Sequence, residues 1–322
     1  MEYVNLGRSG LKVSELCMGT MTFGGQADEE ESAEMVRMCL DAGINFFDTA
    51  NVYNDGRSEQ IVGQALQDER DRVVLATKVR GRRGPAPNQV GLSRRHILEE
   101  VENSLRRLRT DHVDLYQLHQ PDYDTPIEET MAAMDRLVRQ GKVRYVGVSN
   151  YAAWQILQAQ NFCTANGLAP IVSVQPMYNL IARGVEQELL PFCRQYGVGV
   201  IPYNPLAGGL LTGKHDRRKP PADDTRFDRK GTYRERYWHA RMFDAVEALE
   251  DIAQEAGRSM VELSLQWLVS RREVTSVILG ASRPEQLRED LEACAGELPE
   301  GVAEQCDDVW ERLRGPIPMY NR

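Results

Sequence analysis

Short β-rich runs alternate with amphipathic helical runs about eight times along this chain. The β-rich runs are SELCMGT, NFFDTA, RVVLATKV, VDLYQLH, VRYVGVSN, IVSVQPM, GVGVIPYN and VTSVILGA. Strands that alternate with helices pair in parallel through right-handed crossovers. Eight such units predict an α/β fold that closes as a (β/α)8 TIM barrel, and favour it over an open doubly wound sheet.

The remaining segments fit around this barrel. YVNLG and LKV flank Arg8-Ser9-Gly10 and predict an N-terminal β-hairpin. Asp28 and Glu31 predict a capped helix over 28–40, and Thr125-Pro126-Ile127-Glu128 is read as a second capping box. We expect a long charged loop over 206–240, one helical run over 243–270, and extra C-terminal helices over 284–294 and 301–314. The prediction is one domain over residues 1–322.

Charge and cysteine usage exclude several classes of protein. The net charge of −9 and the pI of about 5.3 argue against nucleic-acid binding, which needs a basic surface. The sequence contains no run of 18 apolar residues, so we expect no membrane span. The first residues lack the pattern of a signal peptide. The six scattered cysteines form no metal-binding or disulfide pattern, so we expect reduced core residues in a cytoplasmic protein.

Polar or small residues end the predicted strands. In an α/β barrel the active site lies at the carboxyl ends of the strands. These ends therefore predict one site, although each residue alone is weak evidence. They are Thr20, Asp48, Lys78, His119, Ser149, Asn150, Gln175, Tyr203, Asn204 and Gly280 to Ser282, and Tyr53 follows the second strand closely.

A lysine near a tyrosine indicates what chemistry these strand ends could perform. A tyrosine hydroxyl has a pKa near ~10, and a nearby ammonium lowers that value. Lys78 can act so on Tyr53 while Asp48 orients Lys78, and His119 can donate a hydrogen bond to a carbonyl oxygen. The alternatives are a core histidine at 119, a turn cap at 48 and a packed aromatic at 53.

Four motifs in order resemble the aldo/keto reductase family over nearly the whole chain. INFFDTANVYNDGRSEQIVGQAL resembles the segment that supplies an aspartate and a tyrosine, VVLATKV the lysine strand, and DLYQLHQPD the histidine strand. The resemblance implies the catalytic tetrad Asp48, Tyr53, Lys78 and His119. It also implies an oxidoreductase that reduces aldehydes or ketones with NADPH, with Tyr53 as the proton donor. Related potassium-channel β-subunits have another residue at the histidine position, so His119 favours a working enzyme.

The same resemblance implies a nicotinamide cofactor. GVSN, VQPMYN and IPYNPLAGGLLTGK resemble the family's strand ends that hold the carboxamide, the nicotinamide ring and the pyrophosphate. GGLLTGKH mimics a phosphate-binding P-loop but lacks the Ser or Thr after its lysine. The residues implied are Thr20, Met21, Asp48, Ser149, Asn150, Gln175, Tyr203, Asn204, Pro205, Leu206, Ala207, Gly208 and Lys214.

GASRPEQLREDLEA resembles the family's adenosine-phosphate segment. Ser282 and Arg283 beside a helix that begins at Pro284 form an anion site, which favours NADPH over NADH. Asp290 and Asn204 depart from the asparagine and serine of many relatives, and Met21 stands where channel-type relatives have tryptophan. The residues implied at the adenosine end are Gly280, Ser282, Arg283, Gln286, Glu289 and Asp290.

Two other functions remain open from the sequence. The first is a cofactor-sensing regulatory subunit with little turnover. The second is a metal-dependent barrel hydrolase, but only His119 and Asp48 could serve as ligands and Lys78 between them repels a cation, so we expect no metal. The expected partner is a small carbonyl compound, and its pocket would use the loops 21–30, 80–92, 120–126 and 206–240.

Overall fold

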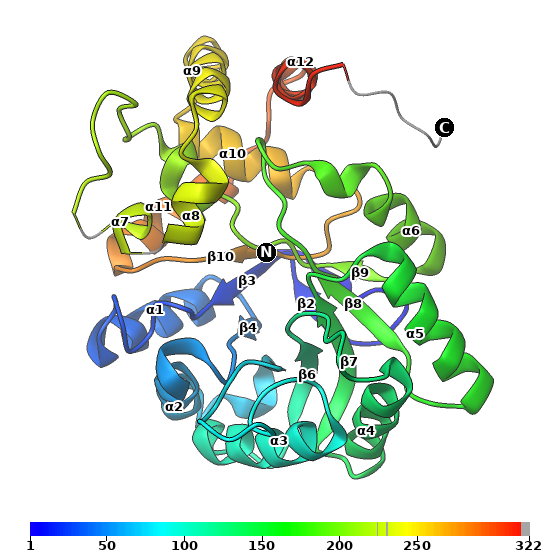
Figure 1. The fold of residues 1–322 in the computed structure, drawn as a ribbon. Coiled ribbons are helices and arrows are strands. Elements are labelled where there is room, and N and C mark those ends of the chain that lie inside the picture. Colours follow the sequence, from blue (N-terminus) through cyan, green and yellow to red (C-terminus); the bar gives the residue numbers. More distant parts are fainter. Residues whose placement is uncertain (224, 230, 317–322) are drawn as a thin grey trace. The chain divides into compact units, whose positions relative to one another are not determined.

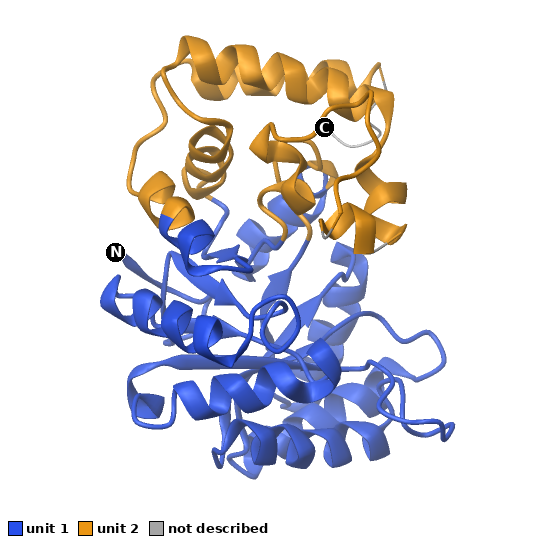
Figure 2. Cartoon of the chain, turned by 90° about the vertical axis from the view of Figure 1, so that its left-hand side faces the viewer, with its two compact units in different colours: residues 1–176, 185–203, 273–288 blue, residues 177–184, 204–272, 289–322 orange. Residues whose placement is uncertain are grey.

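The structure, a computed structural model, describes residues 1–223, 225–229 and 231–316. Residues 224 and 230 of the predicted loop, and 317–322 at the end of the predicted domain, lie outside the described residues. The chain divides into two compact units, coloured in Figure 2 and described separately here. Unit 1 comprises Met1–Pro176, Val185–Tyr203 and Glu273–Arg288, and unit 2 comprises Met177–Gly184, Asn204–Arg272 and Glu289–Arg322. The single domain stays a prediction.

Unit 1 contains the predicted barrel. Among the described residues, eight parallel strands pair in the order β10-β3-β4-β5-β6-β7-β8-β9. The backbone N–H groups of Thr275 and Ile278 donate to the carbonyls of Val200 and Pro202 at 2.8 and 3.0 Å, which joins the last strand to the β9 side and closes the ring. The strands are β3 (Leu16–Gly19), β4 (Phe46–Asp48), β5 (Val74–Val79), β6 (Val113–Leu118), β7 (Val143–Ser149), β8 (Ile171–Gln175), β9 (Gly199–Val200) and β10 (Val277–Leu279).

Helices follow the strands of unit 1 and surround them (Figure 1). The predicted capping box of the first helix is confirmed, because Asp28 and Glu31 bond each other's backbone N–H at 2.9 and 3.0 Å. The capping box predicted at Thr125 is wrong. Extended Pro126 is the cap, and the Thr125 hydroxyl donates to the Asp122 carboxylate at 2.8 Å instead. The helices are α1 (Glu29–Asp41), α2 (Arg57–Ala65), α3 (Arg94–Leu108), α4 (Ile127–Arg139), α5 (Ala153–Asn166) and α6 (Leu189–Tyr196).

The predicted N-terminal hairpin is confirmed as β1 (Tyr3–Asn5) and β2 (Lys12–Ser14), which pair antiparallel. Its Leu6 and Val13 are fully buried in the same core cluster as Phe46 and Val74, the first residues of β4 and β5. The hairpin thus covers the amino ends of the strands. The carboxyl ends, where polar residues gather, stay on the opposite side of this core.

Unit 2 holds helices where the sequence predicted a loop. The predicted continuous run over 243–270 is also wrong: it breaks at Gly257, whose φ is 64°, and restarts at Ser259, whose hydroxyl caps the next helix. Helix α11 (Pro284–Cys294) begins at the predicted proline and crosses the boundary between the units. The other elements are the 3-10 helix η4 (Ala207–Thr212), α7 (Arg226–Arg229), α8 (Gly231–Tyr237), α9 (Ala240–Glu255), α10 (Met260–Val269) and α12 (Val302–Arg314).

All six cysteines have free thiols, and all but Cys294 are buried, as the sequence predicts for core residues. Among residues 1–223, 225–229 and 231–316, no helix is both long enough and apolar enough to span a bilayer. Nor do three His, Cys, Asp or Glu side chains of this described part come together as a metal-binding group.

Candidate active site

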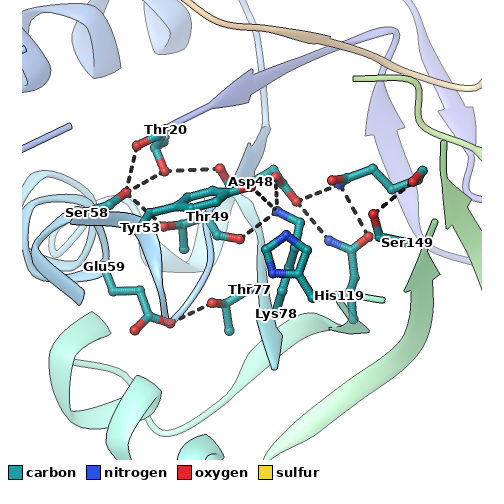
Figure 3. Close-up of polar contacts among 12 residues, drawn as sticks. Thr20, Asp48, Thr49, Tyr53, Ser58, Glu59, Thr77, Lys78, His119 and Ser149 are labelled. Carbon is teal, nitrogen blue, oxygen red and sulfur yellow. Dashed lines mark hydrogen bonds and ion pairs between the residues drawn. The ribbon is translucent and has the colours of Figure 1, made fainter. Parts of the chain in front are cut away.

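Lys78 lies at the centre of the predicted site (Figure 3). It is completely buried on β5, and its ammonium donates to the Asp48 carboxylate, to the Thr49 carbonyl at 2.8 Å and to the Tyr53 hydroxyl at 3.2 Å. Burial acts to lower the pKa of Lys78, but Asp48 and Tyr53 oppose it, and the net result is a raised pKa. Lys78 therefore stays charged, and its three donors have fixed directions.

Asp48 is held from a second side by amides. It ends β4 and is 2% exposed, and its Oδ1 accepts from Gln117 at 2.8 Å and from Gln175 at 2.9 Å. The sequence reasoning missed Gln117, although a glutamine inside the apolar run VDLYQLH was a visible signal. Gln175 was predicted to hold a nicotinamide carboxamide; its amide nitrogen here holds Asp48.

Tyr53 begins a short 3-10 turn, η1 (Tyr53–Gly56), just after β4. Asn54 and Asp55 have positive φ values of 46° and 56°, which are unfavourable for residues with side chains. The Asn54 amide donates to the carbonyls of Met21 at 3.0 Å and Phe23 at 2.7 Å, so the turn is tied to the loop after β3. This anchoring keeps the Tyr53 ring within 4.9 Å of the Lys78 nitrogen.

His119 completes the predicted group at the end of β6. Its ring meets the Tyr53 ring edge-on, with 5.9 Å between centroids and 80° between planes. Burial, Lys78 and Arg80 lower the pKa of His119 to about 3. A neutral imidazole carries one N–H donor, so His119 can donate a hydrogen bond at neutral pH without bringing a second positive charge beside Lys78.

Residues of unit 1 that were predicted to bind the cofactor gather at neighbouring strand ends. The Ser149 hydroxyl donates to the Gln175 carbonyl at 2.9 Å, and the Tyr203 hydroxyl donates to the Asn150 amide oxygen at 2.8 Å. Thr20 differs, because it is completely buried and its hydroxyl donates to the Asp48 carbonyl at 3.1 Å. Met21 supplies a backbone carbonyl to the Tyr53 turn.

The predicted adenosine segment forms the start of α11. Gln286 accepts from the backbone N–H and the hydroxyl of Ser282 at 3.0 and 2.9 Å, which fixes the entry to the helix. Gly280, Arg283 and Glu289 are exposed. Asp290 is 6% exposed, and burial together with Glu289 raises its pKa to about 7.

Within unit 2, the predicted pyrophosphate strap is a braced, left-handed loop. The φ values of Asn204, Ala207 and Gly208 are 65°, 51° and 72°. Asn204 accepts from the Gly208 N–H at 2.7 Å and donates to the Tyr237 hydroxyl at 2.8 Å. Pro205 and Leu206 lie in this loop, and Lys214 follows it with an exposed side chain.

A second polar layer behind Lys78 was not foreseen from the sequence. Glu59 is completely buried and accepts from the Thr77 hydroxyl and from Arg107, both at 2.6 Å. Its neighbour Glu100 accepts from the Asn51 amide at 2.7 Å. These bonds join α2 and α3 to the segments that carry Lys78 and Tyr53.

Comparison with known proteins identifies the family. The model of the aldo/keto reductase family matches residues 15–311. The chain is 42% identical over 301 residues to a probable voltage-gated potassium channel subunit beta of Oryza sativa subsp. japonica, with 91% of each chain covered. It is 37% identical over 329 residues to the uncharacterized oxidoreductase YrpG of Bacillus subtilis (strain 168), covering 99% of this chain and 98% of the relative.

Another relative carries an aldehyde reductase name. The chain is 36% identical over 323 residues to aflatoxin B1 aldehyde reductase member 2 of Rattus norvegicus, covering 95% of this chain and 87% of the relative. Oxidoreductases thus stand beside a channel subunit among its relatives, and the family match covers nearly all of the closed barrel. This chain belongs to the aldo/keto reductase family.

Proposed function

We propose that the chain reduces aldehydes and ketones to alcohols with NADPH, using Tyr53 as the proton donor and Asp48, Lys78 and His119 as its partners. The observation that carries the proposal is the 3.2 Å contact between the Lys78 ammonium and the Tyr53 hydroxyl. An adjacent cation stabilises the phenolate that remains after proton transfer. The contact therefore favours transfer of the Tyr53 proton to a substrate oxygen.

The residues present fit an anionic dinucleotide. Arg283, at the start of α11 in unit 1, is an exposed cation. Ser149, Asn150 and Tyr203 offer amide, hydroxyl and aromatic groups at adjoining strand ends, which suits a carboxamide on a flat ring. NADPH, when bound, supplies a hydride for the carbonyl carbon.

The tetrad divides the work of proton transfer. Tyr53 donates its proton to the carbonyl oxygen, while Lys78 steadies the phenolate. Asp48 keeps Lys78 charged and aimed, and Gln117 and Gln175 keep Asp48 in place. Neutral His119 donates a hydrogen bond that orients the carbonyl oxygen and stabilises its growing negative charge.

Replacing Tyr53 by Phe tests the proposal. We expect turnover of aldehydes, followed as NADPH loss, to fall by roughly 10²- to 10⁴-fold, because the general acid is gone. NADPH affinity, followed by quenching of protein fluorescence, should change little. The control is Tyr145→Phe, which removes a hydroxyl from β7 without touching this site. Unchanged turnover in Tyr53→Phe would refute the assignment.

A regulatory subunit is the second candidate, since a relative at 42% identity is named a channel subunit. His119, a polar group beside Tyr53, favours an enzyme over a regulatory subunit. A panel of aldehydes and ketones, with NADPH and NADH measured in parallel, separates the two. Tight NADPH binding with negligible turnover of every carbonyl would support the regulatory subunit.

We also propose a cytoplasmic setting and a single functional domain over residues 1–322. The net charge of −9 supports a small-molecule partner over nucleic acid. The free, mostly buried thiols support a reducing compartment.

A further inference from the structure

Arg80 directly follows β5 and has a strained backbone conformation. It lies two residues after Lys78, and its φ is 142°, a region that side-chain-bearing residues rarely adopt. Its backbone carbonyl accepts from the backbone N–H of Gly91 at 2.8 Å. The backbone N–H of His119 donates to the carbonyl of Val79, the residue before Arg80, at 2.9 Å. The surrounding backbone therefore holds Arg80 at the rim of the site despite the strain.

The Arg80 side chain has an unmet hydrogen-bonding demand. Its Nε is buried and has no acceptor, and its guanidinium makes no hydrogen bond or ion pair to any residue in the described part of the chain. The next arginines of the loop differ: Arg83 pairs with Asp55 at 2.6 Å, and Arg82 donates to the Gly84 carbonyl at 3.1 Å. A buried donor without a partner is costly, so an acceptor from outside the chain would be favoured there.

One electrostatic neighbour of Arg80, His119, belongs to the site. The positive charge of Arg80 acts to lower the pKa of three side chains: His119 and Asp122, which follow β6, and Tyr151, which follows β7. Asp122 is already engaged, since its carboxylate accepts from the Leu92 N–H at 2.6 Å and from Thr125 at 2.8 Å. These bonds occupy Asp122, and no ion pair joins it to Arg80 among the described residues, so the Arg80 guanidinium keeps donors available for a ligand.

We propose that Arg80 determines substrate specificity by binding an acidic group, a carboxylate, on the carbonyl substrate. The proposal rests on the proposed function and names its substrate class. An arginine fork matches the two oxygens of a carboxylate. With Arg80 beside His119, a carboxylate bound there leaves the carbonyl end of the same molecule near His119 and Tyr53. This local cation favours an acidic substrate over its neutral analogue, although the chain as a whole has a net charge of −9.

The test compares two aldehydes that share a ring and a formyl group and differ in a carboxylate against its methyl ester. 4-Carboxybenzaldehyde carries the charge, and methyl 4-formylbenzoate has the same ring and aldehyde without it. In Arg80→Gln we expect kcat/KM for the acid to fall about 10- to 100-fold, the effect of losing a charge-assisted hydrogen bond. The value for the ester should stay within about twofold, because the tetrad is unchanged. Arg80→Lys should fall between, since it keeps the charge and loses the fork.

The control Arg82→Gln removes an equal charge two residues away and should leave both substrates unchanged. A binding measurement separates this proposal from the proposed function. In the presence of NADPH, calorimetry with 4-(hydroxymethyl)benzoate and its methyl ester needs no turnover. Weaker binding of the acid alone in Arg80→Gln supports the proposal even where no aldehyde is reduced. Equal effects on acid and ester, or an equal effect of Arg82→Gln, would overturn it.

Discussion

At the residue scale, Lys78 is a buried cation whose charge is balanced by one carboxylate, that of Asp48. Lys78 and Asp48 are 0% and 2% exposed, so neither charge is solvated by water. Removing one partner of such a pair leaves the other charge buried and unpaired. The Lys78–Asp48 pair, which we propose supports proton transfer, thus also contributes to the stability of the fold.

We therefore expect Lys78→Met to lower the free energy of unfolding by ~3–5 kcal/mol. The double variant Lys78→Met/Asp48→Asn should recover part of that loss, because no charge remains unpaired. Urea unfolding followed by circular dichroism measures both. The exposed pair of Arg72 and Glu69 is the control, and Arg72→Met should cost less than about 1 kcal/mol. A double variant no more stable than Lys78→Met would contradict the argument.

The sequence could place some residues of the candidate site near one another, because position along a single strand was enough. Asp48, Lys78 and His119 lie at or beside the carboxyl ends of three successive strands, which meet at one edge of a parallel sheet. Gln117 was visible as a polar residue in an apolar run, but its bond to Asp48 could not be foreseen, because that bond depends on register: Gln117 lies opposite Lys78 in the parallel pairing of β5 with β6. Register depends on contacts between distant segments, which a local pattern does not contain.

At the scale of elements, the turn η1 connects the loop after β3 with the residue proposed as proton donor. Its left-handed Asn54 and Asp55 are followed by Gly56 with φ of 86°. Asn54 offsets its own strain with two hydrogen bonds to the β3 loop. Tyr53 therefore depends on a neighbouring element for its position.

Two substitutions at position 54 separate strain from anchoring. Asn54→Gly and Asn54→Ala both remove the amide bonds, so we expect kcat to fall in both. Ala also suffers at positive φ, so Asn54→Ala should be less stable than Asn54→Gly by ~1 kcal/mol in thermal unfolding. Asn88→Ala, in the exposed part of the loop after β5, is the control and should change neither quantity. A normal kcat in both variants would show that Tyr53 needs no such anchor.

Helix boundaries show what a local pattern can and cannot predict. The box at Asp28 formed because both of its partners lie within one turn. The box expected at Thr125 did not form because the helix begins one residue later, with Pro126 at the cap. Gly257 and the box of Ser259 with Glu262 stood in the sequence and marked the break between α9 and α10, but the apolar periodicity on both sides concealed it.

At the scale of the whole molecule, His119 couples proton binding to folding. Its pKa is about 3 in the folded chain and ~6.5 in an unfolded one, so the unfolded chain binds the proton more readily. The contribution of His119 to the free energy of unfolding is therefore fully present above pH ~6.5 and is lost as the pH falls from there toward 3. At pH 5 the loss from this one group is ~2 kcal/mol.

In His119→Gln this linkage disappears. We expect the difference in unfolding free energy between wild type and variant to move by ~2 kcal/mol, in the variant's favour, between pH 7.5 and pH 5. Urea titrations at the two pH values measure it. His239→Gln, at an exposed site on the surface, serves for comparison and should show no such change. A constant difference between wild type and His119→Gln would mean that His119 is not held neutral.

The bonds from Thr275 and Ile278 to Val200 and Pro202 also bear on how the protein is made. The last strand, Val277–Leu279, completes the ring between partners that were synthesised long before it. Until it leaves the ribosome, the nascent chain has two unpaired strand edges, which are sites for misassociation with other chains. Chaperone demand during translation should therefore persist until Val277–Leu279 emerges.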